Sequence, residues 1–132
     1  MGTVEEKNKE VVKAFMEAMN SIQGDIEKIP AIVDKYISPE FVNHTQQGDG
    51  SFDSTVRFYQ MGYTGYPDMK TEIQDIIAEG DKVVVRATTT GTHTGYLGDN
   101  PPTGNKINVT PIAIFRVDNG KIQEEWHSEG LQ

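Results

Sequence analysis

The sequence predicts an α+β fold, in which N-terminal helices pack on one face of a mainly antiparallel β-sheet. Apolar residues recur at helical spacing in the first half of the chain, whereas the second half contains Val-, Ile- and Thr-rich segments typical of strands. Two hairpin signals, Glu79-Gly80-Asp81 and Asp118-Asn119-Gly120, separate those segments. A length of 132 residues fits one domain, so residues 1–132 are expected to form a single domain.

Three helices are predicted in the first half of the chain. The first covers residues 4–22 after Thr3 as N-cap, and its apolar stripe contains Val4, Val11, Val12, Phe15 and Met19. The second covers residues 25–37, where Pro30 either kinks the helix or begins a new first turn. The third covers residues 52–66 and places Phe52, Val56, Tyr59 and Tyr63 on one face.

Four strands are predicted in the second half, two within residues 69–93 and two within residues 106–129. The segment "FVNHT", residues 41–45, is either strand or coil. Strand alternation places His93 on the same face as the apolar residues Val83, Val85 and Ala87. On the last strand it predicts that Ile122, Glu124, Trp126, Ser128 and Gly130 share one face, and Gln123, Glu125, His127 and Glu129 the other.

Composition excludes several classes of partner. A net charge of −8 without a Lys/Arg-rich run argues against nucleic acid and against a charged membrane surface. No apolar run reaches the roughly 18 residues that a membrane span needs, and the charged N-terminus does not resemble a signal peptide. The absence of cysteine fits a reducing compartment, so a cytoplasmic protein is expected. The expected partners are small molecules and a second copy of the chain.

Several segments resemble the SnoaL-like polyketide cyclase family, within the nuclear-transport-factor-2-like superfamily of cone-shaped folds. The matching segments occur in the family's order: "FVNHT", "PDMKTEIQDIIAEGDKVVVRATTTGTHTG", "PPTG" and "IFRVDNGKIQEEW". The resemblance implies a strongly curved sheet that encloses a mostly apolar cavity with the helices, and a homodimer through the opposite sheet face. It also implies no metal or organic cofactor, with an acid/base residue near the end of the last strand.

Two histidines match family segments. His93 lies in "GTHTG", where it is either a neutral imidazole at the cavity rim or a histidine that bonds backbone in a glycine-rich bend. His44 lies in "FVNHT" and can face the cavity from the helical side, with Asn43 beside it. The positions 44, 93 and 127 match no compact ligand pattern, so no metal site is predicted.

The last strand departs from the family. The family's acid follows the tryptophan by four residues, and that position is Gly130 here. Glu129 is adjacent, but a regular strand would point it the other way. Glu124 has two interpretations: a carboxyl beside Ile122 and Trp126 whose pKa burial raises, or the partner of a salt bridge with Arg86 or Arg116.

The predicted function is cofactor-independent acid/base chemistry, of cyclisation or isomerisation type, on a hydrophobic oxygenated molecule. The candidate catalytic residues are His44, His93, Glu124 and Glu129, and the candidate substrate-binding residues are Asn43, Tyr63, Trp126, Phe15 and His127. The alternative is a ligand-binding or dimerisation module of the same fold that has lost the family's acid at Gly130.

Overall fold

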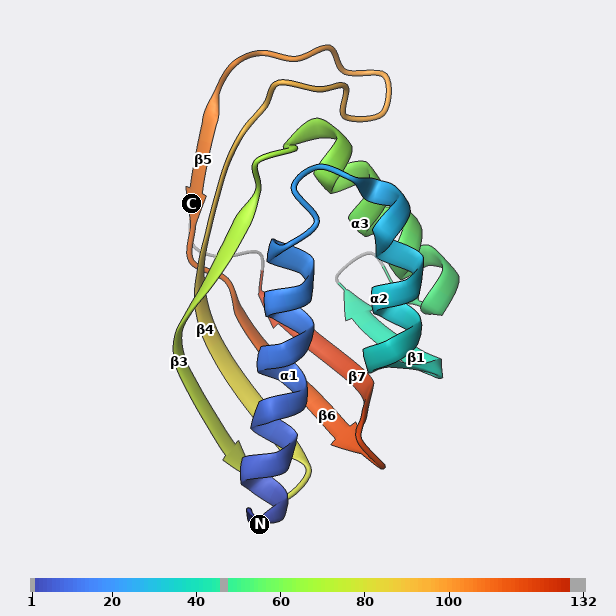
Figure 1. Ribbon diagram of the computed structural model, residues 1–132, viewed down its shortest axis with the longest axis vertical. Coiled ribbons are helices and arrows are strands. Elements are labelled where there is room, and N and C mark those ends of the chain that lie inside the picture. Colours follow the sequence, from blue (N-terminus) through green and yellow to red (C-terminus); the bar gives the residue numbers. More distant parts are fainter. Residues whose placement is uncertain (1, 46–47, 129–132) are drawn as a thin grey trace.

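The computed structural model of the protein describes residues 2–45 and 48–128. Three α-helices and one 3-10 helix precede or interrupt the strands (Figure 1): α1 Val4–Asn20, η1 Ile26–Lys28, α2 Ile29–Tyr36 and α3 Phe52–Gly65. The strands are β1 Ile37–Thr45, β2 Gly48–Gly50, β3 Lys70–Glu79, β4 Lys82–Thr92, β5 Lys106–Val109, β6 Ile112–Asp118 and β7 Lys121–Ser128.

The strands form one curved sheet, and the helices lie against one of its faces (Figure 1). The strand order is β2-β1-β7-β6-β4-β3, and β5 also pairs with β4. All of these pairs are antiparallel except β1 with β7, which is parallel. The predicted α+β fold with helices on a curved, mainly antiparallel sheet is confirmed.

Local sequence signals set the helix ends. The Thr3 hydroxyl accepts a hydrogen bond from the Glu6 backbone N–H at 3.1 Å, as predicted for the N-cap. Pro30 lies in the first turn of α2, where its missing N–H costs no helical hydrogen bond. The second helix therefore begins anew at Ile29 after the short η1. At α3, Ser51 and Ser54 form a reciprocal capping box.

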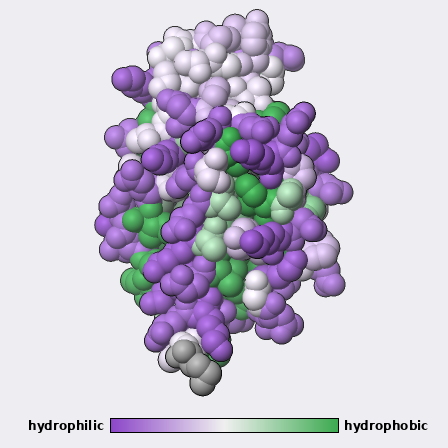
Figure 2. Space-filling model, viewed as in Figure 1, coloured by the Kyte–Doolittle hydropathy of each residue, from purple (hydrophilic) through white to green (hydrophobic). Residues whose placement is uncertain are grey.

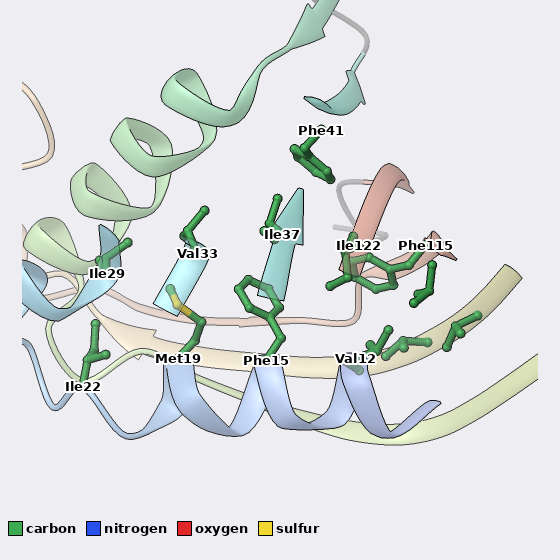
Figure 3. Close-up of a cluster of buried hydrophobic side chains, with 14 of the residues drawn as sticks. Val12, Phe15, Met19, Ile22, Ile29, Val33, Ile37, Phe41, Phe115 and Ile122 are labelled. Atoms are coloured by element: carbon green, nitrogen blue, oxygen red, sulfur yellow. The ribbon is translucent and has the colours of Figure 1, made fainter. Parts of the chain in front are cut away.

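The hydrophobic core lies between α1, α2 and the inner face of the sheet (Figure 3). Val12, Phe15 and Met19 project from successive turns of α1 toward the other elements. The outward side of the helical layer is mostly hydrophilic (Figure 2). The buried residues of α2 and the strands that complete this core are Ile29, Val33, Ile37, Phe41, Val83, Val85, Ala87, Phe115, Val117 and Ile122.

A β-bulge at Gln123 changes which residues of β7 face the helices. Val117 pairs with Ile122, but the next residue toward the start of β6, Arg116, pairs with Glu124, which leaves Gln123 without an opposite residue. Ile122 is fully buried, and beyond the bulge Glu125 is buried too. The predicted alternation on this strand was therefore wrong, because one extra residue reverses the two faces beyond it.

A second difference lies in the segment predicted as one strand over residues 106–118. The structure divides it into β5 and β6, both of which pair with β4. Pro111 stands between them and has no N–H to donate, while its carbonyl accepts from the Ala87 N–H at 3.0 Å. The chain therefore keeps its place beside β4 without continuous pairing.

Candidate functional site

The inner face of β7 carries two titratable side chains beyond the bulge. Glu125 and His127 both point toward the helices, and His127 Nδ1 lies 3.5 Å from Glu125 Oε2. The side chain of Glu125 is 12% exposed and that of His127 is 19% exposed. A carboxyl and an imidazole thus adjoin each other in a largely desolvated place that keeps some contact with the surface.

Burial raises the pKa of the Glu125 carboxyl to about 7. The cause is desolvation, because few neighbouring charges or donors compensate the carboxylate for the water it loses. Burial also raises the pKa of Tyr59 well above its usual value, and the nearby charge of Glu125 adds to this effect. Tyr59 lies on α3, so this helix brings its phenol toward the carboxyl.

Two buried polar groups lie on the elements around Glu125. Asn43 is its neighbour in the parallel pairing of β1 with β7, so both side chains share the inner face. Asn43 Oδ1 is buried and accepts no hydrogen bond from the described residues, and the same holds for the hydroxyl of Thr55 on α3. A buried polar atom without a partner costs free energy, and a ligand that carries polar groups can satisfy it. We call Asn43, Tyr59, Glu125 and His127 the inner cluster.

A second polar cluster lies on the opposite face of the sheet. His44 Nε2 lies 2.8 Å from Glu124 Oε2, and His44 Nδ1 lies 3.0 Å from Asp49 Oδ1. The second oxygen of Glu124 accepts from Arg116 Nε at 2.5 Å. The His44 ring stacks on Trp126, with 4.9 Å between centroids and 12° between planes. We call Asp49, His44, Glu124 and Arg116 the outer cluster.

The charges of the outer cluster compensate one another. The hydrogen bond to Glu124 raises the pKa of His44, and the contact with Asp49 acts in the same direction. The bonds from His44 and Arg116 lower the pKa of Glu124. Of the two interpretations of Glu124, the salt bridge with Arg116 is therefore the one found. The bonds of the outer cluster thus favour the ionised form of Glu124, whereas burial in the inner cluster favours the protonated form of Glu125.

His93 lies apart from both clusters. His93 follows the end of β4, eight residues beyond Val85, and Ala113 of β6 lies between Val85 and His127 across the sheet. Eight residues of extended chain, roughly 26 Å, therefore separate His93 from the row that contains His127. The ring stacks on Tyr66, and Nδ1 lies 3.0 Å from the Thr103 hydroxyl. The backbone N–H of His93 donates to the Asn105 carbonyl at 2.9 Å. His93 thus holds together the two ends of the loop formed by residues 93–105, at the top of Figure 1.

The comparisons with known proteins agree with this architecture. The model of SnoaL-like polyketide cyclases matches residues 7–131. The chain belongs to this family. No protein among the curated sequences matches the chain.

Solved structures show the same SnoaL-like fold. A protein described as a proposed SnoaL-like polyketide cyclase from Jannaschia sp. CCS1 superposes with a TM-score of 0.80 at 22% identity, over 97% of this chain and 88% of the other. IdmH from Streptomyces antibioticus, a proposed polyketide cyclase, has a TM-score of 0.74 and 27% identity over 92% and 90% of the two chains. AclR from Streptomyces galilaeus, a proposed hydroxylase, has a TM-score of 0.72 and 28% identity over 88% and 73%.

The SnoaL-like chain does not gather all its predicted site residues in one place. The inner face receives Asn43 and His127, while His44, Glu124 and Trp126 lie together on the outer face. The expectation that His44 faces the helical side was wrong, since His44 shares its face with Trp126. Phe15 and Tyr63 are core residues at 3% and 4% exposure. Glu129 and Gly130 lie outside the described residues.

The sequence interpretation missed Glu125 as a functional candidate. Regular alternation assigned it to the face opposite Ile122, and only the bulge returns it to the core side. One signal in the sequence was available: "EEW" offers two adjacent carboxylates, so either face of this strand receives one. A bulge decides which of the two is buried.

Two classes of feature are not found in the described part of the SnoaL-like chain. Within residues 2–45 and 48–128, no three His, Asp or Glu side chains are grouped so that they could hold a metal ion. In the same residues, no helix combines the length and apolar character needed to span a membrane.

Proposed function

We propose that the protein is a small-molecule enzyme that transfers protons at carbon atoms next to a carbonyl group, with Glu125 as the acid/base. The observation that carries this proposal is the buried carboxyl of Glu125, whose pKa is raised to about 7, beside His127. A carboxyl with a pKa near the working pH is divided between both protonation states. It can therefore take a proton in one step and return it in the next.

In the proposed step Glu125 removes one proton from the substrate and later returns it. The Glu125 carboxylate takes a proton from the carbon next to a substrate carbonyl, and the electron pair of the C–H bond moves into an enolate. Asn43 or His127 donates a hydrogen bond to the oxygen that becomes negative, since an amide N–H and an imidazole N–H are both suitable donors. The protonated Glu125 then returns its proton to the substrate after rearrangement or ring closure.

The proposed substrate is a hydrophobic oxygenated molecule, bound in the cavity that the family resemblance implies. The family and the proposed cyclase IdmH support a reaction of the cyclisation or isomerisation class. AclR is a proposed hydroxylase with the same fold, so the fold alone does not determine the reaction. No metal or organic cofactor is part of the proposed step. We also propose that the chain forms a single domain and acts in the cytoplasm.

An exchange experiment tests this function without knowledge of the natural substrate. Apolar 1,3-diketones and aryl ketones are incubated in D₂O with the protein, and loss of the α-proton signal is followed by NMR. The parent protein is expected to accelerate exchange, and Glu125→Gln to lose about a hundredfold of that rate, a typical general-base contribution.

Glu124→Gln is the matched comparison, because it removes the neighbouring carboxylate from the outer cluster. A greater loss in Glu124→Gln than in Glu125→Gln would move the site to His44 and Glu124, as the sequence-based prediction has it. If the protein binds these ketones without accelerating exchange in any variant, the binding-module alternative is favoured.

We further propose that two copies associate through the outer face of the sheet. Neighbouring residues on five strands form a stripe there, which we call the outer stripe: His44, Trp126, Ile114, Val84 and Ile77. Ile77 is 64% exposed and Ile114 38%. With Trp126 and Val84 they line an open depression of about 830 Å³. An exposed apolar surface of this kind marks an interaction site.

The charges beside the outer stripe favour a second copy as the partner. On one side lie Glu124, Arg116, Lys82 and Glu79, and on the other Arg86 and Asp75 with Ile112, so acids and bases are equal in number along these two sides, while Asp49 adjoins His44 at the end of the stripe. The whole chain carries −8. A locally balanced face lets two such acidic proteins meet without direct repulsion, and a two-fold axis repeats every contact between a base of one copy and an acid of the other.

Ile114→Glu is expected to convert the dimer to a monomer, since it places a charge at the centre of the apolar contact. Sedimentation velocity at micromolar concentration measures the change. Phe58→Glu is the control, because Phe58 is also exposed, at 59%, but lies on α3 on the other side of the molecule. A parent protein that sediments as a monomer, or a dimer that Phe58→Glu disrupts equally, would contradict this interface.

A further inference from the structure

His44 stands at one end of the outer stripe with both ring nitrogens occupied by carboxylates. Asp49 of β2 contacts Nδ1 at 3.0 Å, and Glu124 of β7 contacts Nε2 at 2.8 Å. Trp126 of β7 lies under the ring plane, and Arg116 of β6 holds the far oxygen of Glu124. These are the charged and aromatic groups that the described strands around His44 direct toward it.

Such a ring is fully bonded only in its protonated form. An imidazolium has two N–H groups and can donate to Asp49 and Glu124 together, whereas a neutral imidazole has only one. Loss of the proton leaves a nitrogen lone pair facing a carboxylate oxygen at about 3 Å, so one of the two contacts becomes repulsive. The stacked arrangement on Trp126 also weakens, because an imidazolium is attracted to the face of the indole as a cation.

We propose that the charge of His44 controls how tightly two copies of the chain associate through the outer stripe, with the protonated ring favouring the dimer. This inference rests on the dimer put forward under the proposed function. It adds a control that the apolar contact alone does not have. The side chain of His44 is 30% exposed, so proton exchange with water is open in the monomer.

The direction of the effect follows from the charges. The outer cluster contains two carboxylates, one guanidinium and one imidazole, so its sum is zero when His44 is protonated and −1 when His44 is neutral. Burying a neutral cluster between two copies costs less than burying a net charge. Each copy also carries −8 with neutral histidines, so a proton on each His44 reduces the repulsion between them. The raised pKa of His44 brings this change toward neutral pH.

Protonation of His44 affects the association constant of the dimer twice, once for each copy. In a two-fold dimer each copy contributes its own His44, so any preference of the dimer for the proton enters the association constant squared. A preference of about threefold per ring gives about a tenfold lower Kd at pH 6 than at pH 8. A residue far from the interface contributes no such change.

Measurement of the dimer Kd by sedimentation at pH 6, 7 and 8, at constant ionic strength, tests the inference. The parent protein is expected to show the tenfold change, and His44→Gln to show a Kd that is nearly constant across this range. His93→Gln is the control histidine, since His93 belongs to the loop of residues 93–105, and it should retain the dependence of the parent.

A second variant and a second signal make the test independent of one substitution. Asp49→Asn removes one stabilising carboxylate at an exposed position, so the midpoint of the pH dependence should move to lower pH. Trp126 is the single tryptophan of the chain, and its emission should fall as the stacked His44 ring becomes charged, because imidazolium quenches indole. This signal should be absent in His44→Gln.

The outcomes separate the two proposals. A parent that is monomeric at every pH overturns the dimer and this inference with it. A dimer whose Kd does not change with pH, or changes equally in His44→Gln, overturns only the role of His44. Movement of the midpoint in Asp49→Asn together with a flat profile in His44→Gln supports it.

Discussion

Replacing Glu125 by glutamine is expected to make the protein more stable than its parent at pH 8 and about equally stable at pH 5. The pKa of this carboxyl is raised from 4.5 to about 7 in the folded protein by burial. Between these two values the folded state binds more protons than the unfolded state, so the free energy of unfolding falls as the pH rises. The loss amounts to about 3 kcal/mol when complete.

Glutamine avoids this loss, because it keeps the shape of the side chain without an ionisable group. Urea unfolding of parent and variant at pH 5 and pH 8 measures the difference. Glu124→Gln is the matched control with the opposite sign: His44 and Arg116 lower the pKa of Glu124, so its carboxylate stabilises the fold above its ordinary pKa, and its loss should destabilise at pH 8. Equal pH profiles for Glu125→Gln and the parent would show that Glu125 ionises as an exposed carboxyl does.

The titration of Glu125 is also relevant to the proposed function, because desolvation of this carboxyl affects both the stability of the protein and the strength of Glu125 as a base. A carboxyl that destabilises the protein when it is charged has been desolvated by its surroundings, and such a carboxyl is also a stronger base than one in water. The protein would then retain Glu125 at a cost in stability at alkaline pH. Proteins commonly accept such a cost at a functional site.

The part of the fold that short sequence signals control was predictable. Caps at Thr3, the proline at the start of α2 and the Asn119-Gly120 turn act over a few residues, so their patterns can be read without knowledge of distant contacts. Asn119 has a positive φ of 54° and Gly120 of 75°, the conformation that this turn requires. The hairpins and helices therefore lie where they were expected.

The candidate site was less predictable, because it depends on the register between strands far apart in the chain. Ile122 pairs with Val117 on one side and with Ile37 on the other, and its burial fixes the start of β7. Glu124 must meet Arg116 and Val42 at the same time. The bulge at Gln123 accommodates the difference of one residue between these pairings, and no local pattern in "KIQEEW" predicts the bulge. A shift of one residue exchanges Glu124 for Glu125 as the buried acid.

For His93, the two interpretations from the sequence differ in what they require of the loop of residues 93–105. A group at a cavity rim needs a ring nitrogen available to a ligand, and Nε2 is buried without a hydrogen-bond partner among the described residues. A residue that holds a bend needs bonds across it, and His93 makes three with Thr103, Gly104 and Asn105. The bonding role is present in the structure, and the catalytic role stays a prediction.

Gly95→Ala is expected to detach this loop from α3 and to cost about 3 kcal/mol or more of stability. A Cβ at Gly95 would lie 2.0 Å from the carbonyl oxygen of Thr64, so the backbone on one side has to move. The N–H groups of Thr94 and Gly95 donate to the Gly65 carbonyl at 3.2 and 3.1 Å, and such a movement breaks both bonds. Each bond contributes about 1 kcal/mol, and the clash adds its own cost.

Gly62→Ala provides the matched comparison, because Gly62 lies on α3, the helix whose Thr64 carbonyl Gly95 approaches. Its added Cβ would meet only the end of the Met69 side chain, at 3.5 Å, and alanine is the better helix former by up to about 1 kcal/mol. Thermal unfolding should therefore show a lower Tm for Gly95→Ala and an unchanged or higher Tm for Gly62→Ala. Amide hydrogen exchange should locate the loss in residues 93–105 and the end of α3. If Gly95→Ala unfolds like the parent, the loop does not depend on this close approach, and the bonds of His93 to Thr103, Gly104 and Asn105 suffice to hold it.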